Sequence, residues 1–223
     1  MKRLLCTFIF VVLAAISART SDAQVIYNTR GAFDLAHPIN YVIDFNNFGP
    51  DGTFYPSGLT ASTPVGNVSF LGIPQTNFST EILSASHFGI GTLLDGNFVL
   101  SASQGQFLTD SLLITLPANT FSFGTDIISP SSTVAEPYQF TVFSGSTVLA
   151  VVPSPSVYGS YTFIGFDSLT SPITSITVQI ANALGNGEPV LDNFTVVPEP
   201  STWFGALAAA GAVLVIGRRR IRA

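Results

Sequence analysis

The chain has 223 residues, enough for one domain with a substantial core, and only 9% of them are charged. Its formal net charge of −5 hides an uneven distribution, because residues 24–197 contain eleven acidic side chains and a single basic one, Arg30. Such a region cannot neutralise phosphates, which excludes nucleic acid as a partner, whereas it suits solubility or divalent cations.

The N-terminus, residues 1–23, has the pattern of a secretory signal peptide. Two basic residues precede an apolar stretch at 4–16, and small residues at Ser21 and Ala23 provide the site that a signal peptidase needs before residue 24. Cleavage after Ala18 is an alternative. With 13 residues, the apolar stretch is too short for a comfortable membrane span, so we expect it to be removed.

Residues 24–196 are predicted to form one all-β domain, a β-sandwich of the jelly-roll type. Ser, Thr, Asn, Gly, Pro and Phe are abundant there, a composition that favours strands and turns. A short helical turn is expected only at 29–36. Turn signals such as Asp95-Gly96 and Ser144-Gly145 separate the strand-like runs. The ten predicted strands are 41–45, 67–71, 97–102, 112–116, 120–127, 138–143, 147–152, 161–166, 175–180 and 190–197.

Asp44 and Asp192 are the candidate metal ligands of this domain. They belong to the first and last clear strands, which are neighbours in many jelly-roll modules. Their carboxylates, with Asn193 and backbone carbonyls, could supply part of the six to eight oxygens that Ca²⁺ takes. The predicted ion is structural, and no other cofactor is expected. In the alternative interpretation each carboxylate caps a strand end or turn through local hydrogen bonds.

Motifs for catalysis are missing from the mature region. The only cysteine, Cys6, lies in the signal peptide, and no helical spacing links His37 and His87 as zinc ligands. The mature sequence also lacks a Gly-x-Ser-x-Gly nucleophile elbow and any lysine. We therefore predict that the protein is not an enzyme. A glycoside hydrolase with two carboxylates about 5–9 Å apart in a cleft remains an alternative, because the sequence does not fix that spacing.

The segment from Trp203 to Gly217 carries no charge over 15 residues. A helix of this length spans about 22 Å, less than the roughly 30 Å hydrocarbon core, but an interfacial Trp203 and snorkelling arginines extend the usable length. We therefore predict one marginal transmembrane helix at about 202–217. The basic cluster at 218–222 halts transfer and keeps the ectodomain outside the cytoplasm. Its arginines are Arg218, Arg219, Arg220 and Arg222.

Pro198, Glu199 and Pro200 stand directly before this helix, and the two prolines favour an extended, protease-accessible segment. Motif, helix and basic cluster together, residues 197–223, resemble the PEP-CTERM sorting signal of Gram-negative bacteria that make extracellular polysaccharide. The resemblance implies processing at or near the motif by a membrane-embedded exosortase. This tail is also catalogued as an ice-binding protein C-terminal domain, but the chain has no regular Thr-x-Thr array for ice. An ordinary single-pass anchor is the alternative that physics alone leaves open.

Short pieces of the domain also resemble a recurrent ectodomain of PEP-CTERM proteins. This resemblance implies a lectin-like sandwich and no particular activity. One departure is Asn46-Asn47, where such proteins often carry a further acid, and it weakens any metal site taken from the family. The pieces that carry the resemblance are 27–33, 42–45, 111–117, 121–124, 161–166, 172–178 and 191–196.

Taken together, these features predict an exported, non-enzymatic surface or matrix protein. Its C-terminal helix holds it transiently in the inner membrane, an exosortase processes it at Pro198-Glu199-Pro200, and it then joins the exopolysaccharide matrix of the cell surface. A carbohydrate-binding module is the main alternative, because Tyr138, Tyr158 and Tyr161 could line one face and stack against sugars.

Overall fold

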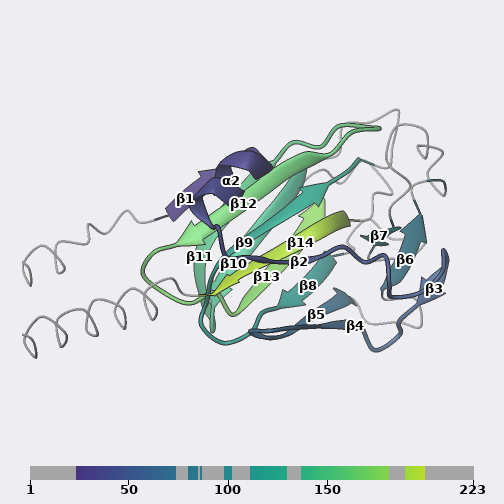
Figure 1. Ribbon diagram of the computed structural model, residues 1–223, viewed down its shortest axis with the longest axis horizontal. Coiled ribbons are helices and arrows are strands. Elements are labelled where there is room, and N and C mark those ends of the chain that lie inside the picture. Colours follow the sequence, from purple (N-terminus) through teal and green to yellow (C-terminus); the bar gives the residue numbers. More distant parts are fainter. Residues whose placement is uncertain are drawn as a thin grey trace, which may run out of the picture.

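The computed structural model describes residues 24–73, 80–84, 86, 98–101, 111–129, 137–180 and 189–198. These residues form two antiparallel β-sheets that share one core, with a single short helix outside the larger sheet (Figure 1). The larger sheet contains β1 (Gln24–Tyr27), β2 (Tyr41–Ile43), β3 (Thr53–Phe54), β6 (Glu81–Ser84), β7 (Phe98–Ser101), β9 (Thr120–Ile127), β12 (Thr162–Ser168) and β14 (Val190–Pro198). The smaller sheet contains β4 (Leu59–Thr63), β5 (Gly66–Ile73), β8 (Ser111–Thr115), β10 (Tyr138–Ser144), β11 (Thr147–Ser154) and β13 (Ser175–Ile180).

The strand order confirms the predicted all-β sandwich. The larger sheet runs β1-β12-β9-β14-β7-β6-β3, with β2 paired to β14, and the smaller runs β11-β10-β13-β8-β5-β4. From β8 to β14 the chain crosses repeatedly between the two sheets, as jelly rolls do. Each of the ten predicted strands coincides with one of these. The strands β1, β3, β4 and β6 were not predicted.

The predicted signal peptide at 1–23 and the predicted helix at 202–217 lie outside the described residues. Within the described part of the chain, no helix combines the length and the apolar character that a membrane crossing requires. Both hydrophobic ends therefore stay predictions from the sequence.

Phenylalanine side chains fill the space between the two sheets. In β10 the buried positions alternate strictly, with Tyr138, Phe140 and Val142 facing inward, as the period of two in a strand requires. Phe194 of β14 packs at 5.3 Å from the Phe70 ring of the opposite sheet and at 6.1 Å from Phe123 of its neighbour β9. Aromatic residues therefore serve mainly as scaffold in the described core.

A bulge in β14 changes which residues face this core. Leu191 and Phe194 are both core residues although they are three apart, an odd spacing that regular alternation would place on opposite faces. Asn193 takes up the extra residue with φ of 48°, and the register with β9 shifts between Asp192 and Thr195. The bulge thus directs Asp192, Asn193 and Thr195 to the outer face of the larger sheet.

The helix α2 (Arg30–Ala36) packs on that same outer face. Thr29 begins it as an N-cap whose hydroxyl accepts a hydrogen bond from the Ala32 N–H. Phe33 is fully buried against the paired glycines Gly124 of β9 and Gly165 of β12, which leave a flat area for its ring. The short helical turn predicted at 29–36 is confirmed.

We predict that Gly165→Ala destabilises the domain by about 1–3 kcal/mol, the usual cost of overpacking. A Cβ at this position would lie 2.6 Å from Phe33 Cδ2 and 3.0 Å from Phe163 Cε1. Urea unfolding followed by circular dichroism measures the effect. The matched control is Gly31→Ala on α2, where nothing lies within 4 Å and the free energy of unfolding should stay unchanged or rise slightly. Equal stabilities for the two variants would contradict the packing argument.

Candidate functional site

The sorting motif adjoins the folded domain without a linker. Val196 and Val197 are buried on opposite faces of the larger sheet, and Pro198 is the last residue of β14, paired with Thr120 of β9. Glu199 and Pro200, like the arginines 218–222, lie outside the described residues. The structure therefore shows only the first residue of the Pro-Glu-Pro motif, and that residue is already part of the sheet.

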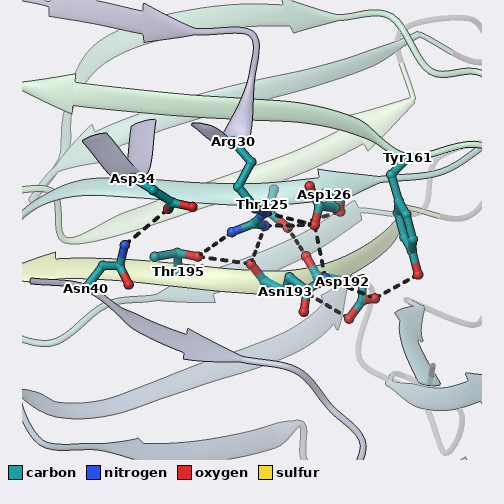
Figure 2. Close-up of polar contacts among 9 residues, drawn as sticks. All are labelled: Arg30, Asp34, Asn40, Thr125, Asp126, Tyr161, Asp192, Asn193 and Thr195. Atoms are coloured by element: carbon teal, nitrogen blue, oxygen red, sulfur yellow. Dashed lines mark hydrogen bonds and ion pairs between the residues drawn. The ribbon is translucent and has the colours of Figure 1, made fainter. Parts of the chain in front are cut away.

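A second set of polar residues lies on the outer face of the larger sheet, beneath the start of α2 (Figure 2). Its centre is Arg30, whose Nε and Nη2 donate to Asp126 Oδ2 at 3.2 and 2.8 Å. The same guanidinium donates to Thr195 Oγ1 and to the Asn193 carbonyl on the bulge of β14, at 3.2 and 3.0 Å. Its carbon Cζ lies 4.8 Å from the centroid of the Phe163 ring, in cation–π geometry. We call this set, with Asp192 and Tyr161, the Arg30 network.

The bulge residue Asn193 joins the two carboxylates of the Arg30 network. Its side-chain amide donates to Asp126 Oδ2 at 3.0 Å and to Asp192 Oδ2 at 3.4 Å, and its backbone N–H donates to Asp192 Oδ1 at 2.7 Å. Asp126 and Asp192 are partners in the β9–β14 register, so without these donors two buried carboxylates would face each other across adjacent strands. The left-handed conformation of Asn193 is one that Asn adopts more readily than most residues.

The structure places the predicted calcium ligands in different surroundings. Asp44 follows β2, and its Oδ1 accepts the N–H of Asn46, which is the local capping that the alternative interpretation expects. Asp192 is fully buried and accepts hydrogen bonds from Tyr161 and Asn193. Among the described residues, no group of three or more His, Cys, Asp or Glu side chains stands together in a way that could hold a metal. Calcium binding at Asp44 and Asp192 stays a prediction.

A third cluster fixes the other end of α2. His37 Nε2 lies 2.8 Å from Asp167 Oδ1, and the Tyr27 hydroxyl donates to Asp167 Oδ2 at 2.8 Å, so both oxygens of this buried carboxylate have partners. The rings of Tyr27 and His37 also pack against Phe33, with centroids 5.4 and 4.5 Å away. The N-terminal segment 24–37 is thus held on the sheet by Arg30 at one end and by His37 at the other.

Sequence reasoning did not find these two clusters. Arg30 was recognised as the only base of the mature region, but its partner Asp126 is 96 residues away in the chain. The tyrosines proposed for sugar stacking are not all exposed. Tyr138 is fully buried and donates to the Ile128 carbonyl, so it is not part of the sugar-stacking face that the carbohydrate-binding alternative requires. The hydroxyl of Tyr161 donates to Asp192, and Tyr158 is 38% exposed.

Comparison with known proteins identifies the tail. Residues 196–221 match the family model described as the PEP-CTERM protein-sorting motif, which begins inside β14. A tail of this kind implies an exported protein that a membrane anchor holds transiently before exosortase processing. No curated protein matches the chain.

Several solved structures are similar to the domain. The K2 cleaved adhesin domain of Lys-gingipain has a TM-score of 0.45 and 12% identity, over 71% of this chain and 99% of that one. A family 29 carbohydrate-binding module from Piromyces equi has a TM-score of 0.40 and 9% identity, over 72% and 91%. The module TmCBM61, solved with β-1,4-galactotriose, has a TM-score of 0.38 and 12% identity, over 67% and 100%. At these scores the similarities carry no argument about ligand or activity.

We predict that Arg30→Ala lowers the free energy of unfolding by about 2–3 kcal/mol, because it leaves the buried Asp126 carboxylate without its cationic partner. Urea unfolding measures the loss. Arg30→Lys keeps the charge but not the planar fork, so it should recover only part of the stability. Adding Asp126→Asn to Arg30→Ala removes the unpaired negative charge and should also restore part of the lost stability. Strictly additive effects of the two changes would show that the pair does not interact.

We also predict a loss of stability at high pH that depends on Tyr27. Burial, with the hydrogen bond to Asp167, raises the pKa of Tyr27 from 10.0 to about 12. The folded state therefore keeps this proton to a higher pH than the unfolded state. Its contribution is fully present below about pH 10 and disappears as the pH rises to about 12. Urea unfolding at a series of pH values should give a shallower decline for Tyr27→Phe over this interval, and parallel curves would contradict the assignment.

Proposed function

We propose that this chain is an exported, non-enzymatic surface or matrix protein, delivered by its PEP-CTERM tail and released or transferred by an exosortase at Pro198-Glu199-Pro200. The observation that carries the proposal is the match of residues 196–221 to the sorting motif, immediately after a folded β-sandwich. The exopolysaccharide matrix is the proposed destination, because sorting signals of this family accompany its production.

The surroundings of three described acidic residues support a structural role for them. Asp126, Asp167 and Asp192 are buried, and each accepts hydrogen bonds from the chain's own donors. A catalytic carboxylate must instead reach the substrate or its attacking water. The buried Tyr138 similarly removes one ring from the sugar-stacking surface that the carbohydrate-binding alternative needs.

The position of β14 narrows where processing can occur. Cleavage before Pro198 would require Val196 and Val197 to leave the cores on the two faces of the sheet. A protease acts on accessible, locally unfolded chain, whereas the residues up to Pro198 are paired in the sheet. We therefore place the scissile bond on the C-terminal side of Pro198.

Mass spectrometry of the protein isolated from the cell surface of its host tests this proposal. We expect an N-terminus at Gln24 and a C-terminus between Pro198 and residue 202. The double variant Glu199→Gln/Pro200→Ala leaves Pro198 in β14 and should keep its tail in the inner-membrane fraction, while the control Ser201→Ala should be processed normally. A wild-type surface form that still carries residues 218–223 would reduce the sorting motif to an ordinary anchor.

A further inference from the structure

Both ends of the described chain lie at the same end of the sandwich, on the left in Figure 1. Pro198 pairs with Thr120 at the start of β9, and Gln24 pairs with Ser168 at the finish of β12, which itself pairs with the start of β9. We call this the exit end, because the tail leaves the domain there. It consists of residues 24–25, 38–41, 63–67, 116–120, 144–147, 168–174 and 198.

Hydrogen bonds and contacts tie these segments together. The Ile173 N–H donates to the Thr120 carbonyl, and the Thr174 hydroxyl accepts the N–H of Gly145. A Cβ on Gly66 would lie 3.0 Å from Pro117 Cβ. The β4–β5 turn is therefore at the same end as the β8–β9 turn. Tyr41 pairs with Val196, so the segment before β2 lies beside the last residues of β14.

None of the residues of the exit end has a charged side chain. Their sequence contains hydroxyls, amides, prolines and aliphatic side chains, with Ile39 and Leu169 exposed to 62% and 46%. The acids nearest to it both have partners: Asp167 is buried and bonded to Tyr27 and His37, and the half-buried Asp34 of α2 accepts a hydrogen bond from Asn40.

Three further acidic side chains of the described residues lie toward the opposite end. Glu81 pairs with Ser101, which in turn pairs with Val190 at the start of β14. Asp51 is exposed beside the same strands, and its Oδ1 accepts the N–H of Ser84. Asp44 follows β2 where that strand runs away from the exit end. The domain therefore has, next to its tail, an end without charged side chains of its own, and an acidic end away from it.

The tail holds the exit end close to the bilayer. Only residues 199–202 separate β14 from Trp203, the start of the apolar run, and even a fully extended connection of five residue steps reaches at most about 18 Å. Charges on exposed surfaces act over a screening length of about 8–10 Å at ordinary salt, so acids at this end would be repelled by anionic lipid headgroups. Neutral hydroxyls and exposed aliphatic side chains can instead rest in the headgroup region.

We propose that the exit end is a membrane-docking surface, on which the unprocessed domain rests against lipid headgroups with its acidic end directed outward. The proposal relies on the membrane anchoring of the proposed function and adds to it a defined orientation. In this orientation the junction between β14 and the tail lies at the membrane surface, where a membrane-embedded protease can reach it.

Site-specific energy transfer to lipid tests the docking. The mature chain 24–223 has no cysteine, because Cys6 lies in the predicted signal peptide, so single cysteines can be labelled cleanly. The matched probes are Ser146→Cys at the exit end and Ser57→Cys, which precedes β4 at the opposite end of that strand; both positions are exposed. Each labelled chain, residues 24–223, is reconstituted into phosphatidylcholine–phosphatidylglycerol vesicles containing rhodamine-labelled phosphatidylethanolamine. We expect energy transfer from position 146 to be at least twofold greater than from position 57.

A charge variant separates docking from simple tethering. Leu169→Glu/Thr170→Glu places two acids on the exit end and should remove most of the twofold difference at low salt, whereas the matched neutral variant Leu169→Gln/Thr170→Gln should keep most of it. High salt should restore the difference in the charged variant.

These outcomes separate a failure of the docking surface from a failure of the membrane anchoring on which it rests. Equal transfer from the two probes, or a charge variant that behaves like its neutral control, overturns the docking surface while the anchoring stands. Failure of the labelled chain to float with the vesicles in a density gradient overturns the anchoring and the docking together.

Discussion

The double pairing of β14, with β9 on one side and β2 on the other, is the constraint on which the rest of the larger sheet depends. Its bulge at Asn193 directs Leu191 and Phe194 into the shared core and sends Asp192 and Thr195 to the outer face. The same strand ends at Pro198, where the sorting motif begins. One strand therefore contributes to the core, positions the Arg30 network and presents the processing signal.

The N-terminal segment completes this arrangement from outside. An outward-facing sheet surface with buried Asp126 and Asp167 would be unfavourable alone, because desolvated carboxylates need donors. Arg30, Tyr27 and His37 bring those donors from a single stretch of chain, and Phe33 covers the glycine pair between them. The single base of residues 24–197 is thus paired with one of the buried acids, and hydrogen-bond donors serve the others.

Local patterns were sufficient to predict ten of the fourteen described strands, but not the partners of any of them. The strands with long apolar or alternating runs, such as β9 and β10, are evident in the sequence because their side chains must face a core. β4, with the sequence Leu-Thr-Ala-Ser-Thr, resembles a turn by composition, and β3 has two residues. β4 is a strand because it pairs with β5. The Arg30–Asp126 pair joins residues 96 apart, so only the sheet register brings it together.

The order of the strands along the sequence has a consequence for export. In a chain that emerges from its N-terminus, β9 and β2 are outside long before β14, yet both need β14 as a partner in the sheet. Phe123 and Phe70 likewise lack the Phe194 ring until that strand arrives. Because the apolar run begins at Trp203, five residues after Pro198, β14 becomes available only when the tail is about to enter the membrane. The strand that completes the larger sheet is therefore also the one that leads into the sorting motif.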